Sequence, residues 1–438
     1  MRVAALHDAK RWAIRNARVP ACLTRGTALA SDQNGLAQVD LVVADGRIES
    51  LLPAGMPGLE AETPYLDLGG GIVLPCLVDI HTHLDKGHIW PRTPNPDGTF
   101  TGALDATGAD RVAHWSAGDV RARMDFGLAC AYAHGTSAMR THIDSIGPQT
   151  GISWPVFAQL RDKWRGKVEL QAVPLFGINL ALDEAHILTV LDQLARAKGQ
   201  IMGAVTYMDP ALQEGLDLLF ELAAYKGYDL DFHVDETRDP SAHSLRLIAE
   251  TAIAHEFQGK ILAGHCCSLA MQDPEEAKRT VELVARAGIS VVSLPMCNLY
   301  LQNRQAGTTP RWRGVTLLHE LRAAGVPVMM ASDNVRDPFY AYGDLDMLEV
   351  FREGTRILHL DHPRGDWIKT IASAPAEHML LQGFGVLAAG GKADLILTGA
   401  RDFTELLSRP QSDRRVVRGG RVIDDHVPAY PTLSLGGP

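Results

Sequence analysis

Cysteine is scarce in this sequence, and its spacing is unlike that of a disulfide framework or a zinc finger. Only six cysteines occur in 438 residues. Disulfide-stapled domains carry cysteines densely, and zinc fingers carry them in closely spaced pairs. We therefore expect reduced thiols and a cytoplasmic protein. The cysteines are Cys22, Cys76, Cys130, Cys266, Cys267 and Cys297.

An excess of basic residues and a long apolar run are also missing. The 52 acidic residues outnumber the 42 basic ones, which gives a net charge of −10. Such a charge balance argues against nucleic acid as a partner. Residues 1–18 mix charged and apolar residues throughout, so no signal peptide is predicted. No segment approaches the roughly 20 apolar residues of a membrane span, so we expect no membrane association.

The composition is that of a folded protein with a large core, because 46% of the residues are hydrophobic and 21% are charged. Through the middle of the chain, apolar strand-like runs alternate with helical patterns, which is typical of βα organisation. Helical patterns cover 183–197, 242–255, 274–287 and 317–324. The eight expected strands are 72–80, 137–143, 168–176, 201–208, 229–234, 260–266, 290–294 and 327–332.

Eight strands with intervening helices favour an α/β fold in which residues 71–384 form a (β/α)8 TIM-type barrel. The flanking zones, 1–70 and 385–438, are rich in strand and hairpin patterns. One predicted hairpin joins 39–44 to 47–51 through Asp45-Gly46, and a second joins 414–418 to 421–423. Neither zone is long enough for a good core alone, so we expect both to form one small, β-sandwich-like domain.

Two histidines, His81 and His83, follow the first apolar run of the expected barrel. Alternate side chains of a strand share a face, so both imidazoles point the same way. A barrel presents chemistry at the C-terminal ends of its strands. The pair is therefore well placed to offer two nitrogens to one metal ion.

Other expected strands end in polar residues of the same kind. Strand two ends in His142, strand five in His233 followed by Glu236, strand six in His265 and strand eight in Asp333. A lone histidine is more often a surface or core residue than a ligand, but this joint placement indicates a site. The three nitrogens of His81, His83 and His233 with the carboxylate of Asp333 suit zinc or ferrous iron and leave a position open for water.

Several neighbouring polar residues have two readings. His142 either joins the site or only supports the floor of the pocket. Asp85 and Asp144 either orient ligand histidines or take part in catalysis. Residues 204–208 offer no lysine or carboxylate before Asp209, where two-metal barrel enzymes usually place one. We therefore expect one divalent metal ion.

These segments resemble the amidohydrolase superfamily, and within it cytosine deaminase and its relatives. The resemblance covers essentially the whole chain. The stretch 81–86 is also similar to the N-alkylaminotriazine hydrolases, which release amines. The matching stretches are His81-Thr-His-Leu-Asp85, Arg140-Thr-His-Ile-Asp144, Phe232-His-Val-Asp-Glu236, Gly264-His265, Arg313-Gly-Val315, Ser332-Asp333 and Asp337-Pro338.

The resemblance implies a hydrolytic deamination in which the metal lowers the pKa of a bound water. Glu236 would carry a proton to a ring nitrogen of an amidine-like substrate. Asp333 would bind metal and accept the proton of the attacking water. His265 would orient the attacking oxygen and stabilise the tetrahedral intermediate, which collapses to release ammonia.

The substrate-reading positions depart from the cytosine deaminase pattern. Residues 174–179 contain no glutamine where that enzyme has one, Asn334 replaces a second aspartate, and Phe339 aligns with a tryptophan. A buried site that loses a hydrogen-bond partner changes its discrimination by orders of magnitude. These replacements are compatible with a substituted pyrimidine, another aminated heterocycle, or an N-alkyl amine leaving group. Lys86, Tyr207, Asn334, Arg336 and Phe339 are the candidate recognition residues, although Lys86 could instead pair with Asp85 or Asp144.

The sequence thus predicts a mononuclear metal-dependent aminohydrolase that acts on a small cytosine-like or other aminated N-heterocycle. The alternative keeps the metal site but releases an alkylamine or opens a cyclic amide. A non-enzymatic barrel is a third reading, and the retained His81, His83, His233, Glu236, His265 and Asp333 argue against it. The relatives also imply a homo-oligomer.

Overall fold

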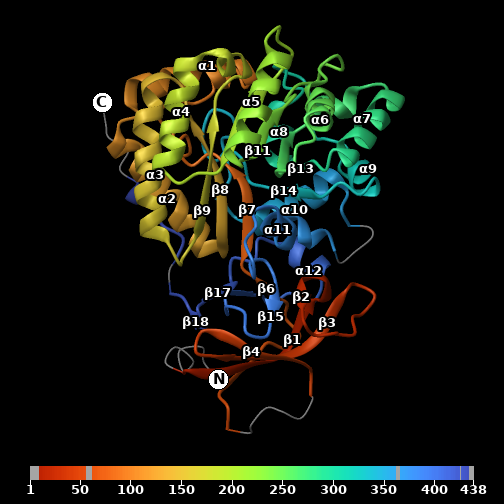
Figure 1. Ribbon diagram of the computed structural model, residues 1–438. Coiled ribbons are helices and arrows are strands. Elements are labelled where there is room, and N and C mark those ends of the chain that lie inside the picture. The colour runs from red at the N-terminus through yellow and green to blue at the C-terminus, as the bar shows by residue number, and fades with distance from the viewer. Residues whose placement is uncertain (1–8, 56–61, 362–365, 425, 434–438) are drawn as a thin grey trace. The chain divides into compact units, whose positions relative to one another are not determined.

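The computed structural model describes residues 9–55, 62–361, 366–424 and 426–433. The chain has a mixed α/β fold that divides into two compact units (Figure 1). The terminal unit comprises residues 1–79, 129–138 and 346–428, and the central unit comprises 80–128, 139–345 and 429–438. None of the helices in the described ranges is long and apolar enough to cross a membrane.

Among the described residues, two sheets and a series of helices lie wholly or in part in the central unit. One sheet has the order β7-β8-β9, and the other has the order β10-β11-β12-β13-β14. The neighbours in the second sheet are all parallel. The strands are β7 (Leu77–Thr82), β8 (Thr136–Asp144), β9 (Glu169–Leu175), β10 (Ile201–Thr206), β11 (Asp229–Val234), β12 (Ile261–His265), β13 (Ser290–Ser293) and β14 (Val328–Met330).

Helices separate these strands along the chain. All four predicted helical segments are confirmed, as α4, α6, α7 and α9. Helix α7 shows the local cause: Asp273 accepts a hydrogen bond from Glu275 N, Pro274 occupies the first turn, and an apolar stripe faces inward. The helices are α1 (Phe100–His114), α2 (Ala117–His134), α3 (Thr150–Trp164), α4 (Glu184–Arg196), α5 (Leu212–Lys226), α6 (Ser244–Ala254), α7 (Pro274–Arg286), α8 (Pro295–Leu301) and α9 (Leu318–Ala323).

The expected strand 72–80 is wrong in one respect, because the structure divides it into two strands. β6 (Val73–Pro75) pairs with β16 (Leu395–Leu397) in the terminal unit, whereas β7 is the neighbour of β8. Pro75 ends the first strand because proline has no N–H to donate to a ladder. The other seven expected strands each overlap an observed strand.

The terminal unit contains strands from both flanking zones. The sheet orders are β4-β3-β1-β5, β18-β17-β16-β6 and β15-β2. Both predicted hairpins are confirmed as antiparallel pairs, and Asp45 and Gly46 both have positive φ, as a tight two-residue turn requires. The remaining elements are β1 (Arg11–Pro20), β2 (Thr24–Arg25), β3 (Leu36–Ala44), β4 (Arg47–Pro53), β5 (Tyr65–Asp67), β15 (Leu387–Ala388), β17 (Arg415–Arg418), β18 (Arg421–Val422), α10 (Met347–Leu358), α11 (Ser373–His378) and α12 (Phe403–Ser408).

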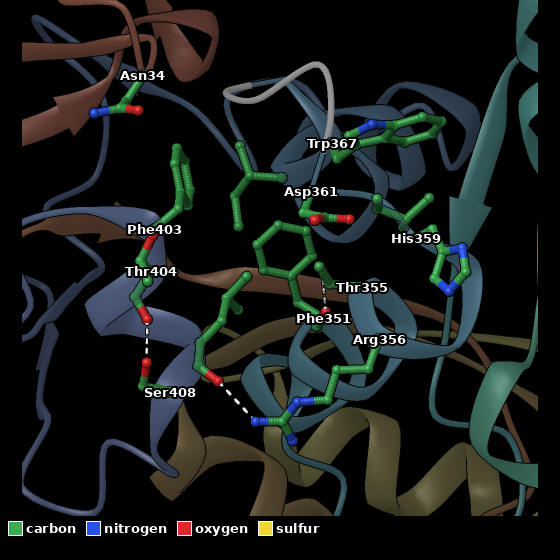
Figure 2. Close-up of a pocket in the computed structure, with 13 residues that line it drawn as sticks. Asn34, Phe351, Thr355, Arg356, His359, Asp361, Trp367, Phe403, Thr404 and Ser408 are labelled. Carbon is green, nitrogen blue, oxygen red and sulfur yellow. Dashed lines mark hydrogen bonds between the residues drawn. The ribbon is translucent and has the colours of Figure 1, made fainter.

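One hydrophobic core joins the two flanking zones within the terminal unit. Trp12, Ile14 and Leu41 from the first zone belong to the same buried cluster as Leu395 and Val417 from the second. The unit also has a pocket of about 550 Å³ that is lined by residues of α10 and α12, among others (Figure 2). Every polar residue predicted for catalysis lies instead in the central unit.

Candidate metal centre

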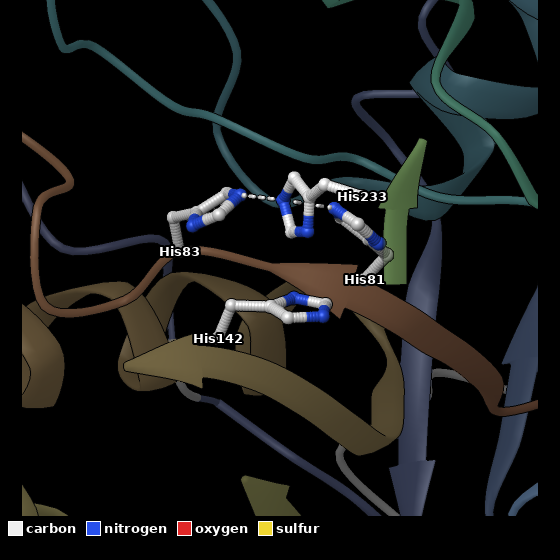
Figure 3. A group of neighbouring side chains, drawn as sticks. All are labelled: His81, His83, His142 and His233. Carbon is white, nitrogen blue, oxygen red and sulfur yellow. Dashed lines mark hydrogen bonds between the residues drawn. The ribbon is translucent and has the colours of Figure 1, made fainter. Parts of the chain in front are cut away.

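Three imidazole nitrogens lie almost in contact at the ends of β7 and β11. His233 Nε2 is 3.1 Å from His81 Nε2 and 3.2 Å from His83 Nε2 (Figure 3). All three side chains are buried. Strand alternation gives the first two residues one direction, and the parallel pairing of β11 with its neighbours places His233 opposite them.

Asp333 completes the group from the segment that follows β14. Its Oδ1 is 3.2 Å from His83 Nε2 and 3.6 Å from His81 Nε2, and its side chain is fully buried. A parallel bridge joins Asp333 to Thr82, with Asp333 N donating to His81 O at 2.9 Å. The backbone of Asp333 is left-handed, with φ of 65°. This bridge and turn bring the carboxylate to the histidines.

The four residues fit a divalent metal ion. Donor atoms arranged tetrahedrally at about 2.1 Å from zinc lie about 3.4 Å apart, and the distances from His81 and His83 to His233 and to Asp333 range from 3.1 to 3.6 Å. Burial lowers the pKa of His81, His83 and His233 well below the usual value, so the imidazoles are neutral and have lone pairs to offer. His233 Nε2 faces two other Nε2 atoms but can share a hydrogen with only one of them at a time, so the three nitrogens converge in the manner of metal ligands.

His142 lies against this group and has a partner of its own. Its ring centroid is 4.1 Å from that of His81 and 4.5 Å from that of His233. His142 Nε2 is 3.2 Å from Asp231 Oδ1, and Arg140 Nη1 donates to Asp231 Oδ2 at 2.8 Å. His142 therefore has neighbours in keeping with both of its predicted readings, since it is close enough to the other histidines to join a four-histidine group.

Glu236 and His265 meet through a residue that the sequence did not single out. Asn298, on α8, donates from Nδ2 to Glu236 Oε1 at 3.2 Å, and the same nitrogen lies 3.0 Å from His265 Nδ1. Burial and then the charge of Asp333 raise the pKa of Glu236 well above its usual value. Burial lowers the pKa of His265 to about 3. A buried asparagine is an ordinary residue type, so the sequence carried no signal for it.

Lys86 pairs with Asp144, which was one of the two readings predicted for it. The Lys86 ammonium is 3.0 Å from Asp144 Oδ1, and Arg111 is 2.9 Å from Asp144 Oδ2. Burial alone would lower the pKa of Lys86, but Asp144 and Asp85 outweigh it and raise the pKa. The Lys86 nitrogen also lies 5.3 Å from the centroid of the Phe339 ring. Asp85 accepts a hydrogen bond from Asp144 N, and burial raises its pKa to about 7.

The other candidate recognition residues fall in two places. Asn334 Nδ2 donates to Asp337 Oδ2 at 2.7 Å, and Asp337 Oδ1 accepts from Phe339 N, so one carboxylate organises this loop. Phe339 packs edge-to-face on Phe100 of α1. Tyr207, after β10, is 40% exposed and donates to Asn179 Oδ1.

The sequence of this chain matches a known family of enzymes. The Amidohydro_3 model of the amidohydrolase family matches residues 140–424, and the chain belongs to this family. The family resemblance predicted from the sequence is thereby confirmed, and the protein is an enzyme that hydrolyses carbon–nitrogen bonds.

Three proteins are similar to this chain over nearly its whole length. A pterin deaminase of Rhizobium rhizogenes (strain K84) is 53% identical over 426 residues, which is 97% of each chain. The crystal structure of 5-methylcytosine deaminase from Klebsiella pneumoniae aligns with a TM-score of 0.78 at 25% identity, covering 94% of this chain and 97% of that one. The N-isopropylammelide isopropylaminohydrolase of Burkholderia multivorans aligns with a TM-score of 0.72 at 26% identity, covering 94% and 98%.

Proposed function

We propose that this protein is a mononuclear metal-dependent aminohydrolase that deaminates a pterin-like heterocycle and releases ammonia. The observation that carries the proposal is the buried group of His81, His83, His233 and Asp333, with Glu236 and His265 beside it. The 53% identity to a pterin deaminase supports the substrate class. The metal is zinc or ferrous iron, because three imidazoles and a carboxylate suit both ions.

The framework of the site is a (β/α)8 barrel in this proposal. Parallel bridges join the two sheets of the central unit at both edges, between Gly177 and Val205 and between Thr82 and Asp333. The eight strands β7 to β14 would then form one closed ring, with the site at their C-terminal ends. The predicted domain boundaries, the cytoplasmic location and the homo-oligomeric state stay predictions.

The protein's residues divide the proton transfers between them. A metal ion held by His81, His83, His233 and Asp333 would supply the chemistry of a Lewis acid, lowering the pKa of water toward neutrality. Asp333 accepts the proton of the attacking water. Glu236, whose pKa is raised by burial, would deliver a proton to a ring nitrogen of the substrate. His265 orients the attacking oxygen. Asp333 then passes the proton it took from water to the amino group, and the C–N bond breaks to release ammonia while the hydroxyl proton returns to Glu236 and the carbonyl forms.

The candidate recognition residues suit an oxo-substituted amino heterocycle. The Lys86 ammonium can donate to a ring carbonyl, and the amide of Asn334 can read a ring edge. The phenyl ring of Phe339, which lies near Lys86, offers an apolar face to a flat heterocycle. Tyr207 is the most exposed of the candidate recognition residues, since 40% of its surface is exposed.

Release of an alkylamine is the second candidate function. Lys86 directly follows the stretch 81–85, in the pattern that resembles N-alkylaminotriazine hydrolases. The alignment with an N-isopropylammelide isopropylaminohydrolase over 94% of the chain supports this alternative. The metal site and Glu236 would serve both reactions, because only the leaving group differs.

The identity of the released amine distinguishes the two candidate functions. Protein with its metal content measured would be incubated with pterin, cytosine, 5-methylcytosine and N-isopropylammelide, and ammonia and isopropylamine would be quantified. We expect one metal per chain and ammonia from pterin, with slower or no release from the pyrimidines. Isopropylamine from N-isopropylammelide alone would overturn the deaminase proposal. One bound metal with no turnover of any of the four would exclude both candidates.

A further inference from the structure

Asn298 occupies a position that controls two of the proposed catalytic groups together. It is completely buried on α8. Its Nδ2 lies 3.2 Å from Glu236 Oε1 and 3.0 Å from His265 Nδ1. A primary amide nitrogen has two hydrogens, so one nitrogen can serve both contacts. None of the roles proposed above involves this residue.

The chemistry of the two partners fixes the direction of the amide. Glu236 Oε1 accepts a hydrogen bond whether or not the other carboxyl oxygen carries a proton, so the amide nitrogen is the matching group at 3.2 Å. The same nitrogen then points its second hydrogen at His265 Nδ1, which must offer a lone pair. A neutral imidazole that accepts at Nδ1 carries its proton on Nε2.

The opposite orientation of the Asn298 amide would require a particular proton position on Glu236 and the other tautomer of His265. If the amide oxygen faced these partners, it would lie against a carboxyl oxygen, and the contact would repel unless Glu236 held its proton on Oε1. His265 would then have to donate from Nδ1 and would have a lone pair on Nε2. The tautomer of His265 therefore distinguishes the two arrangements.

The tautomer also decides what His265 can do at the metal centre. A ligand atom of His265 lies in one group with those of His81 and Asp333, all within 4.8 Å of one another, and His265 Nε2 is buried with no hydrogen-bond partner among the residues that the structure describes. A protonated Nε2 cannot ligate a metal, but it can donate to an oxygen atom in the site. His265 would then be a hydrogen-bond donor to the attacking oxygen.

We propose that Asn298 is a positioning residue that holds His265 in the Nε2–H tautomer and anchors the carboxyl group of Glu236 with its other amide hydrogen. This inference rests on the proposed function for the role of the two partners. The hydrogen-bond arrangement itself is independent of which substrate is turned over.

The first test measures the tautomer directly and needs no substrate. Protein with ¹⁵N-labelled histidine, loaded with zinc, is examined by two-bond proton–nitrogen correlation, and the signal of His265 is assigned from its loss in His265→Gln. We expect the proton on Nε2. A proton on Nδ1 overturns the inference, whatever the outcome of the ammonia assay.

The second test reverses the hydrogen bond by one substitution. Asn298→Asp offers only acceptors, so His265 should switch to the Nδ1–H tautomer in the NMR spectrum. We expect kcat for ammonia release from pterin to fall by about 10²–10³-fold, as for other removed oxyanion donors, with KM much less affected and one zinc per chain retained.

A matched control tests the same chemical change elsewhere. Asn303 lies on a turn, where it is half-buried, and Asn303→Asp keeps the acceptor for Arg311 N, so tautomer and kcat should stay native. Asn298→Ala removes both hydrogen bonds without imposing the opposite tautomer, and should lower kcat while retaining zinc. Native kcat in both Asn298 variants would contradict the positioning role even if the Nε2–H tautomer were observed.

Discussion

The ion pair between Arg140 and Asp231 allows a quantitative prediction about stability. Arg140 Nη1 lies 2.8 Å from Asp231 Oδ2, and both side chains are at most 1% exposed. Removing Arg140 takes away the charged partner of the buried Asp231 carboxylate. Arg140→Met should therefore lower the free energy of unfolding by about 3–5 kcal/mol. His142 also contacts Asp231, at 3.2 Å, which favours the lower end of that range.

The assay compares this variant with two others in urea unfolding followed by circular dichroism. Arg140→Met/Asp231→Asn removes both charges and keeps an acceptor for His142, so it should be more stable than Arg140→Met by at least about 1 kcal/mol. Arg246→Met breaks a pair with Glu250 in which both side chains are more than 40% exposed, and should cost about 0.3–0.5 kcal/mol. A loss for Arg140→Met no larger than for this control would refute the reasoning.

Three further predictions concern catalysis, metal and pH. Glu236→Gln keeps an acceptor for Asn298 but cannot deliver a proton, so ammonia release should fall by about 10²–10⁴-fold at unchanged metal content; a native rate would contradict the proposed proton transfer. Removing the metal with a chelator should lower the thermal midpoint, and restoring zinc to 100 times its Kd should return about 3 kcal/mol; a midpoint insensitive to zinc would argue against a folded-state metal site. Burial lowers the pKa of His88 from 6.5 to about 4, so the unfolded chain binds more protons in this range and stability is lost as the pH falls from about 6.5 to 4. His88→Asn, which suits the φ of 66°, should reduce that loss by up to about 3 kcal/mol; an identical pH profile would show that His88 does not contribute.

The grouping of the strand-end residues could be predicted because it follows from local rules. Alternation along a strand orients His81 and His83, and the C-terminal ends of parallel strands bring His233 near them. The hairpin at Asp45-Gly46 was equally predictable, since few dipeptides accept two positive φ values. These features depend on short stretches of sequence and on one assumption about the fold.

Features that depend on distant partners could not be predicted. Arg140 and Asp231 are 91 residues apart, and neither has a spacing that suggests the other. Asn298 gains its place only when α8 packs beside Glu236 and His265. The division of 72–80 into two strands was also missed, because a continuous apolar run does not show which sheet each half joins.

The shared core of the terminal unit has a consequence for synthesis on the ribosome. Trp12 Nε1 donates to Gly420 O at 2.9 Å across 408 residues of sequence, and β6 pairs with β16. At about 5–20 residues per second, the first strands would wait roughly 20–80 s for their partners. During that interval the apolar faces of β1 and β3 have no completed core. Nascent chains should therefore bind chaperones through the segment around Trp12 until residues near 420 emerge.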